Sequence, residues 1–164
     1  MFHQPHPILP AEDDTRQPER GDVVLFCFPT AEEEAEIGLP KRRPCLVLDT
    51  FERGGARFVE LAYGTSAMTK ANRGYEILVK QPASRAAAGL HRPTRFVGAR
   101  RIVVRIDTRG LSALAPTRIG RLDAPLLERM HAVRARLQAE ADIAAHDRAE
   151  KRRDRQARED RGFR

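Results

Sequence analysis

The sequence predicts a mainly β protein of the α+β class: a small antiparallel β-barrel or curled sheet followed by a C-terminal α-helix. Short runs of apolar, β-branched and aromatic residues recur along the first two thirds of the chain, separated by turn-forming residues. Evenly spaced short strands without intervening helices are typical of small barrels. After residue 123 the apolar residues change to helical spacing, which predicts the final helix.

Five runs are predicted as strands: 21–28, 44–51, 57–66, 75–79 and 96–106. The last is long enough for one strand or two, with Gly98 at a bulge or bend. The sequence RGGA at 53–56 predicts a tight hairpin turn, because consecutive glycines accept the positive φ angles that such turns need. Tyr63 alternates with core-facing residues, which favours a packing role.

Asp123 is predicted to cap the C-terminal helix, and a stripe of apolar residues follows it at helical spacing: Leu126, Met130, Val133 and Leu137. We expect this stripe to pack on the barrel; a dimer seam is the alternative. The domain is predicted to span 21–140, after an extended or disordered leader at 1–20. Residues 141–164 are predicted as a solvated helical extension carrying ion pairs, or as a frayed basic tail.

The chain carries 30 Lys and Arg against 23 Asp and Glu, a net charge of +7. This balance favours a polyanionic partner, although a charged surface also serves solubility. Cys27 and Cys45 lie in apolar runs without metal-ligand spacing, so we expect reduced core residues and no metal site. Because neither a membrane span nor a signal-peptide pattern is present, the sequence predicts a cytoplasmic protein without a membrane partner.

Five segments, in order, resemble the PemK/MazF toxins of bacterial toxin–antitoxin systems: RGDVVLFCFP (20–29), KRRPCLVLD (41–49), LAYGTS (61–66), GLHRPTRF (89–96) and IGRLDAPLLERM (119–130). The resemblance implies an SH3-like barrel with a C-terminal helix, usually a homodimer, in which IGRL forms a turn into that helix. It also implies an endoribonuclease that cuts single-stranded RNA without a metal or another cofactor and is silenced by a cognate antitoxin.

The same resemblance implies the catalytic residues. The arginine before the strand proline corresponds to Arg43, and the hydroxyl residue that closes the next strand corresponds to Thr65, with Ser66 beside it. A guanidinium offers two parallel donors to phosphate oxygens and keeps its charge, which suits a reaction that builds charge on phosphorus. The alternatives are a solvated loop charge at Arg43 and hydroxyls that cap a turn at Thr65 and Ser66.

Further residues are predicted to contact the RNA. Lys41 and Arg42 precede the catalytic arginine and would steer the RNA electrostatically. A basic, hydroxyl-bearing segment before the last strand is a second candidate contact, with a simple turn as its alternative: His91, Arg92, Thr94 and Arg95. His91 is also the nearest candidate for the general base.

The acidic run AEEEAEIG at 31–38 departs from the pattern of the PemK/MazF toxins. The resemblance implies that this loop borders the active groove, where carboxylates would repel RNA. It suggests pairing with Arg42 or Arg43 in the free protein, altered substrate choice, or lost activity. The alternative function is a non-catalytic module on the same barrel that binds nucleic acid or inhibits a topoisomerase. A third reading is an adaptor whose basic C-terminal helix does the binding.

Overall fold

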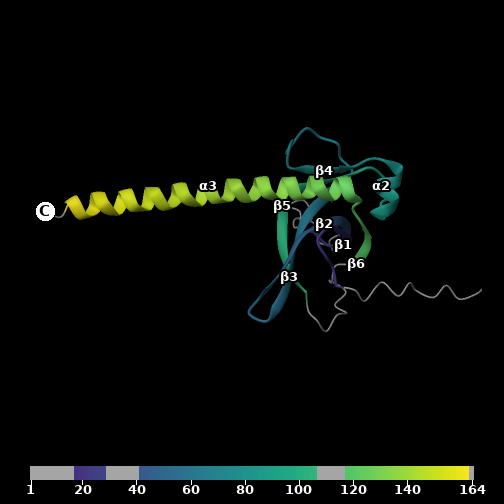
Figure 1. Cartoon of the computed structure of the whole chain (residues 1–164), viewed down its shortest axis with the longest axis horizontal. Helices are drawn as coiled ribbons and strands as arrows, with labels where there is room; N and C mark the ends of the chain where they lie inside the picture. The colour runs from purple at the N-terminus through teal and green to yellow at the C-terminus, as the bar shows by residue number, and fades with distance from the viewer. Residues whose placement is uncertain (1–16, 29–40, 107–116, 163–164) are drawn as a thin grey trace, which may run out of the picture.

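The computed structural model describes residues 17–28, 41–106 and 117–162 (Figure 1). Within these ranges the chain forms six strands and two helices, and the acidic run at 31–38 and the leader up to residue 16 lie outside them. The elements are β1 (Asp22–Phe26), β2 (Arg43–Arg53), β3 (Ala56–Thr65), β4 (Glu76–Val79), α2 (Pro82–Ala87), β5 (Thr94–Ile106), β6 (Thr117–Arg121) and α3 (Ala124–Gly162).

All six strands belong to one sheet in the order β4-β5-β3-β2-β1-β6, and every recorded pair is antiparallel. The sheet curls into a half-barrel, and α3 crosses it (Figure 1). The predicted fold class, a mainly β protein with a small barrel-like antiparallel sheet and a C-terminal helix, is therefore confirmed. The predicted hairpin is confirmed too, since Gly54 and Gly55 have φ angles of 59° and 74° and Arg53 pairs with Ala56.

Three local features differ from the sequence-based prediction or complete it. The resemblance implied a turn at IGRL (119–122), but residues 117–121 form edge strand β6 instead, because their backbone pairs with β1. The short helix α2, at residues 82–87, was not predicted. The run from residue 94 to 106 is one strand, and its register against β3 shifts between Ala62 and Tyr63, where the bulge expected at Gly98 lies.

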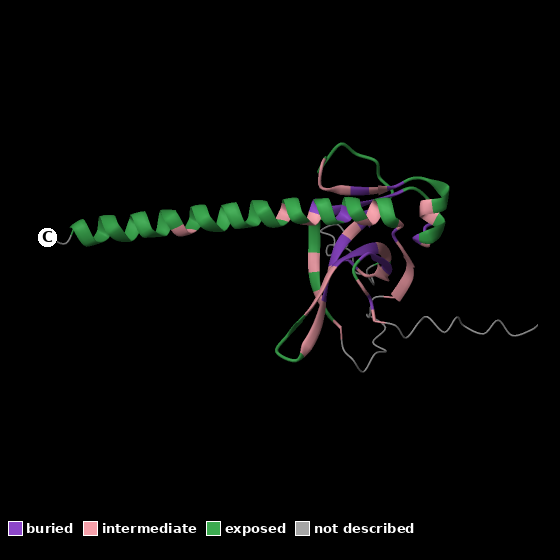
Figure 2. Ribbon diagram, in the orientation of Figure 1, coloured by how far each residue is buried: buried purple, intermediate pink, exposed green. Residues whose placement is uncertain are grey.

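Two apolar clusters lie on the two faces of the sheet. The first joins the sheet to α3 and to the residues after α2, and it includes Leu46, Phe96, Met130 and Val133, all at most 1 % exposed. The second cluster lies on the opposite face of the central strands, and Tyr63 packs against it. Its buried members are Val24, Phe28, Cys45, Val47, Val59 and Leu61. Central strands buried on both faces hold most of the buried residues in Figure 2, as expected for a curled sheet.

Helix α3 begins as predicted and ends much later. The Asp123 carboxylate accepts a hydrogen bond from the amide of Leu126 at 3.2 Å, which makes Asp123 the N-cap. Met130 and Val133 are buried against the first cluster and Leu126 and Leu137 pack beside them, so the stripe serves the intramolecular core as expected. The helix then continues without a break past residue 140 to Gly162, which makes 141–162 a solvated helix and not a frayed tail.

Both cysteines are free thiols, and burial raises the pKa of the Cys45 thiol to about 12. This thiol therefore stays protonated and behaves as the small core hydrophobe that the sequence predicts. In the described part of the chain, no helix combines the length and apolar character needed to cross a bilayer.

We predict that Asp49→Asn lowers the free energy of unfolding by about 1 kcal/mol at neutral pH. Burial alone would raise the pKa of Asp49, but hydrogen bonds from Arg20 and the Thr50 amide and the charge of Arg134 outweigh it and lower the pKa. Such a carboxylate stabilises the fold above its unfolded pKa of about 3.9, and this contribution is lost as the pH falls through the lowered folded pKa.

Urea denaturation of wild type and variant between neutral and acidic pH checks this prediction. The difference in unfolding free energy should be largest at neutral pH and shrink below about pH 4. Asp142→Asn, at an exposed position of α3 that bonds only Gln138, is the matched control and should change little. A difference that persists unchanged in acid would contradict the role given to Asp49.

Candidate functional site

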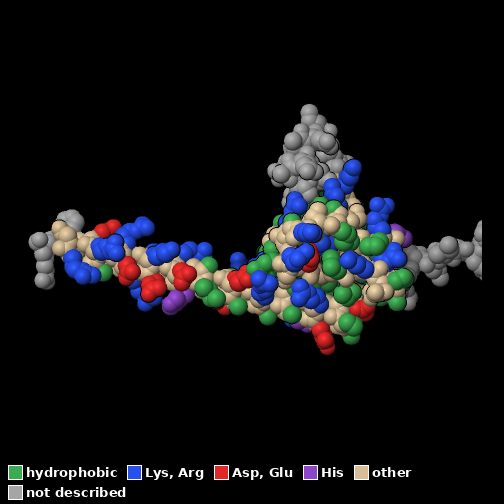
Figure 3. Space-filling model, turned by 90° about the horizontal axis from the view of Figure 1, so that it is seen from above, with side chains coloured by type: hydrophobic (Ala, Val, Ile, Leu, Met, Phe, Trp, Pro, Cys, Tyr) green, Lys and Arg blue, Asp and Glu red, His purple; other side chains and the backbone are tan. Residues whose placement is uncertain are grey.

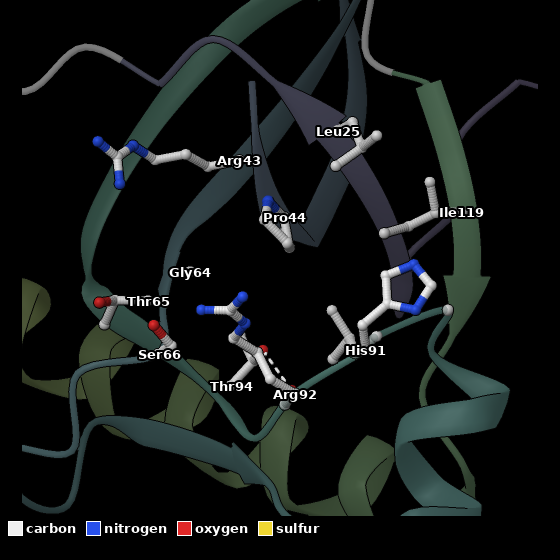
Figure 4. Close-up of a pocket in the computed structure, with 12 residues that line it drawn as sticks. Leu25, Arg43, Pro44, Gly64, Thr65, Ser66, His91, Arg92, Thr94 and Ile119 are labelled. Carbon is white, nitrogen blue, oxygen red and sulfur yellow. Dashed lines mark hydrogen bonds between the residues drawn. The ribbon is translucent and has the colours of Figure 1, made fainter. Parts of the chain in front are cut away.

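One candidate site is an open cavity of about 360 Å³ at one end of the sheet (Figure 4). Residues from β1, β2, the end of β3, the loop after α2, β5 and β6 line it. They are Leu25, Arg43, Pro44, Gly64, Thr65, Ser66, Gly89, Leu90, His91, Arg92, Thr94 and Ile119. The three catalytic residues expected from the sequence therefore lie on the same cavity as three of the predicted RNA contacts.

A close backbone approach between β2 and β3 brings Arg43 and Thr65 to this cavity. A side chain at Gly64 would place its Cβ 2.1 Å from the carbonyl oxygen of Pro44 and 2.8 Å from the ring of Phe96. Only glycine leaves room for such a contact. Gly64 in the segment LAYGTS thus lets β3 lie directly against Pro44 of β2. Arg43 and Thr65 are the residues next to this contact on their respective strands.

Aromatic packing orients the Arg43 side chain. Its guanidinium carbon lies 6.0 Å from the centre of the Tyr63 ring, and that of Arg100 lies 4.2 Å from the same ring. Tyr63 in turn packs on Phe28 with ring centres 5.3 Å apart. The expected packing role of Tyr63 is confirmed, and the ring also favours positive charge over its face.

The Thr65 hydroxyl closes a turn and still has a proton to donate. Its oxygen accepts a hydrogen bond from the amide of Ala67 at 3.1 Å, the turn-capping alternative that the sequence left open. Because a hydroxyl both accepts and donates, this bond fixes the oxygen and leaves the O–H for a ligand in the cavity. Ser66 is exposed beside it, and Figure 4 places both residues on the same side of the cavity.

The opposite wall comes from the loop after α2. Gly89 takes a φ of 67°, and a Cβ there would lie 2.0 Å from the carbonyl oxygen of Ile119, so this turn fits tightly onto β6. Arg85 donates to the carbonyl oxygen of His91 at 3.1 Å, and the Thr94 hydroxyl donates to that of Arg92 at 3.0 Å. These bonds fix the backbone that carries the exposed side chains of His91 and Arg92.

The cavity has cationic groups and no acidic ones among its described lining residues. Arg43 and Arg92 carry permanent positive charge, and the polar remainder consists of hydroxyl groups and the imidazole of His91. The site is therefore suited to an anion. Figure 4 places Thr65, Ser66 and Arg43 on one side and His91 on the other, with Arg92 between them.

Three of the predicted RNA contacts do not line this cavity. Arg95 is 5 % exposed, and its guanidinium is bonded to the Glu76 carboxylate, the Thr69 hydroxyl and the backbone carbonyls of Ala67 and Ala71, so it holds the loop that follows β3. Arg42 donates to the carbonyl of Leu25 at 3.0 Å and to the Thr117 hydroxyl at 2.8 Å. Lys41 is exposed outside the lining.

The apolar half of the cavity was not predicted. Leu25 of β1, Ile119 of β6 and Leu90 of the α2 loop line it together with Pro44. The only sequence signal was the segment IGRL, which was expected to form a turn and instead supplies a strand. Side chains brought together by β1–β6 pairing are distant in sequence, so no local pattern identifies them.

A second cavity, of about 320 Å³, lies between α3 and the sheet and is a weaker candidate. Its charged groups are largely paired with each other, Arg134 with Asp49 and Arg101 with Glu60 at 3.3 Å. Such pairs leave little charge for a ligand. Among the residues that the structure describes, no three His, Cys, Asp or Glu side chains gather as a possible metal site.

Comparisons with known proteins leave the family open, since no protein-family model matches this chain and no curated protein matches it.

We predict that Gly64→Ala destabilises the fold by about 3 kcal/mol, because β2 and β3 must separate to admit a Cβ next to backbone atoms. Gly54→Ala is the control: its Cβ meets open space, and only the positive φ costs about 1 kcal/mol. Urea midpoints of the two variants measure the difference. Equal losses would show that the Gly64 contact is not tight.

Proposed function

We propose that this protein is an endoribonuclease that cleaves single-stranded RNA through attack of a ribose 2′-hydroxyl on the adjacent phosphate. The observation that carries the proposal is that two arginines, three hydroxyl residues and a histidine line one open cavity, without a carboxylate among its described lining residues. Three separate segments supply these groups: 43–44, 64–66 and 91–94. The resemblance of the same segments to PemK/MazF toxins supplies the reaction class.

In the proposed reaction the 2′-oxygen loses its proton and forms a bond to phosphorus. The bond from phosphorus to the 5′-oxygen of the next nucleotide breaks, and that oxygen takes up a proton. The products are a 2′,3′-cyclic phosphate and a 5′-hydroxyl, and no water enters this step. Negative charge grows on the two non-bridging oxygens, so catalysis depends on donors aimed at them.

Arg43 and Arg92 are the groups proposed to stabilise this charge. Both line the cavity, and Arg43 is half-buried on β2, where its backbone is held by pairing with Phe26. A donor positioned in advance loses little freedom when the transition state forms. The hydroxyls of Thr65 and Ser66 would add hydrogen bonds to the same phosphate.

His91 is proposed to move the proton. It lies across the cavity from Thr65 and Ser66, so a phosphate held by the hydroxyls would present its ester oxygens toward the imidazole (Figure 4). Histidine side chains accept and donate protons near neutral pH, which arginine cannot do. Its exposed position also leaves it accessible to substrate.

The apolar wall supports a single-stranded substrate. Leu25, Leu90 and Ile119 form a surface on which an unstacked base can pack, and bases of a duplex are not available for such contact. A cavity of about 360 Å³ is in the range of small-molecule sites and suits one nucleotide better than a helix. The cognate antitoxin, the homodimer and the cytoplasmic location implied by the resemblance or the composition remain predictions.

We predict that Arg43→Ala lowers the cleavage rate at least about 100-fold, the usual cost of removing one donor to a developing oxyanion. The purified protein is incubated in EDTA with a long single-stranded RNA, and the cut ends are mapped. Discrete cuts are expected for the wild type and not for the variant. Replacing the ribose at a mapped site by deoxyribose should abolish that cut, because the nucleophile is gone.

Lys41→Ala is the matched control, since it removes an exposed cation two residues from Arg43 that does not line the cavity. Its effect should be small and should disappear at high salt. A fully active Arg43→Ala protein would contradict the assignment of Arg43. Intact RNA that is retarded on a gel by the wild type would support the non-catalytic binder.

We predict that His91→Ala lowers the rate at saturating RNA by about 100-fold, the lower end of what a proton-transfer group contributes. RNA affinity should change little, because Arg43 and Arg92 remain. Rates and binding to an uncleavable 2′-O-methyl RNA measure the two effects separately. Loss of affinity with an unchanged rate would make His91 a binding residue only.

A further inference from the structure

The second half of α3 stands free of the rest of the protein. From residue 138 to 162 every side chain is exposed except the half-buried Ala149, and the helix projects well beyond the sheet (Figures 1 and 2). At 1.5 Å per residue this free part is about 36 Å long. It buries almost no apolar surface, so it adds little to the stability of the fold.

One face of the free helix carries five cations, which we call the basic stripe: Arg148, Lys151, Arg152, Arg155 and Arg158. Their spacing of three and four residues places them on one side of the helix. The stripe also continues the face that packs on the sheet. Arg148, Lys151 and Arg155 each follow a core residue, Met130, Val133 and Leu137, by eighteen residues, which is five turns at 3.6 residues per turn.

The basic stripe is not neutralised within the described part of the chain. No ion pair there involves any of its five cations, although Asp147 and Asp154 stand four residues before Lys151 and Arg158. The ion pairs predicted for 141–164 are therefore not found among its described residues, and the i,i+4 pair of this helix, Arg136 with Glu140 at 3.1 Å, lies before that segment. Figure 3 shows Lys and Arg side chains predominating along one edge of the projecting helix.

Repulsion between neighbouring cations lowers the stability of the free helix when no ligand is bound. Arg148 and Arg152, and likewise Lys151 and Arg155, are like charges four residues apart, a spacing that destabilises a solvated helix by a few tenths of a kcal/mol per pair. A ligand that brings regularly spaced negative charge removes this repulsion. Glu159 lies at the far end of the stripe, and Asp147 and Asp154 border it one turn before Lys151 and Arg158.

The chemistry of the stripe fits the phosphates of a nucleic acid better than a folded protein. Four of its five members are arginines, whose planar forks bind phosphate oxygens in pairs. The stripe holds no aromatic or large apolar side chain, whereas protein interfaces have an apolar core and few charges at their centre. Non-specific binding of single strands needs only such a line of cations along the backbone.

We propose that the basic stripe is a second RNA-binding surface that holds the phosphate backbone of a single strand outside the cavity. The proposal goes beyond the nuclease reaction, and it does not depend on cleavage. Where the nuclease is active, this surface would retain long RNA on the protein and leave very short substrates unaffected.

The test is binding of the full-length protein to a fluorescent 2′-O-methyl single strand, which has no 2′-hydroxyl to attack, between about 50 and about 200 mM salt. A variant with all five cations changed to Gln should lose about 3.5 from the slope of log affinity against log salt, so that lowering the salt from about 200 to about 50 mM strengthens RNA binding by the wild type about 100-fold more than binding by the variant. Gln keeps the helix propensity, and circular dichroism verifies the helix. A wild-type slope in this variant overturns the proposal.

Two double variants form a matched pair. R148Q/R155Q lies on the stripe and R153Q/R161Q lies on the same free helix outside it, and both remove two charges. Only the first should reduce the salt slope by about 1.4. Equal reductions would mean that net charge alone attracts the RNA, and competition by polyglutamate as effective as competition by RNA would point to an acidic protein; either result overturns the proposal.

Cleavage assays keep this proposal separate from the proposed function. The five-Gln variant should cleave a very short RNA at the wild-type rate and a long RNA with a raised KM. A wild-type protein that binds through the stripe and cuts nothing refutes the nuclease and leaves the second surface intact. A nuclease whose KM for long RNA is unaffected by the five changes refutes the second surface alone.

Discussion

The fold depends on a carboxylate buried at the start of the first strand. Asp22 is 1 % exposed; its carboxylate accepts hydrogen bonds from Arg121 at 2.9 Å and from the amide of Glu19 at 2.8 Å, and it forms an ion pair with Arg118 at 3.3 Å. A buried charge is tolerated only with such partners, and losing one typically costs several kcal/mol. The arginines belong to β6, so Asp22 holds this edge strand to β1. β6 then supports the cavity wall, and the Leu122 amide bonds Gly21 where α3 begins.

The cavity combines a rigid backbone with two positively charged side chains, Arg43 and Arg92. Its polar side chains stand next to the close contact of Gly64 with Pro44 and the tight turn at Gly89, so their positions follow from main-chain packing. This backbone holds Arg43 and Arg92 at the cavity before any ligand binds, and the sheet supplies the stability for that arrangement. This is the usual balance at a site built to bind an anion.

The two arginine-rich surfaces differ in how they are held. At the cavity, strand β2 and the loop after α2 hold the backbone that carries Arg43 and Arg92. On the free half of α3 only helical geometry organises the cations, which suffices for sequence-independent phosphate contacts. Arg95 shows that composition alone does not separate arginines that could bind a ligand from arginines that stabilise the fold, because its guanidinium is bonded to the Ala71 carbonyl and the Glu76 carboxylate.

Local patterns in the sequence determined most of the elements. Alternating β-branched runs, the Gly54–Gly55 turn and the Asp123 cap with its helical stripe all act over a few residues, so each could be predicted without the fold. The resemblance supplied Arg43, Thr65 and Ser66 as candidates. Only the tertiary structure placed them with His91 on one cavity, made residues 117–121 a strand, buried Arg95 and added Leu25 and Ile119. Those features depend on strand pairing between distant segments, which no local propensity encodes.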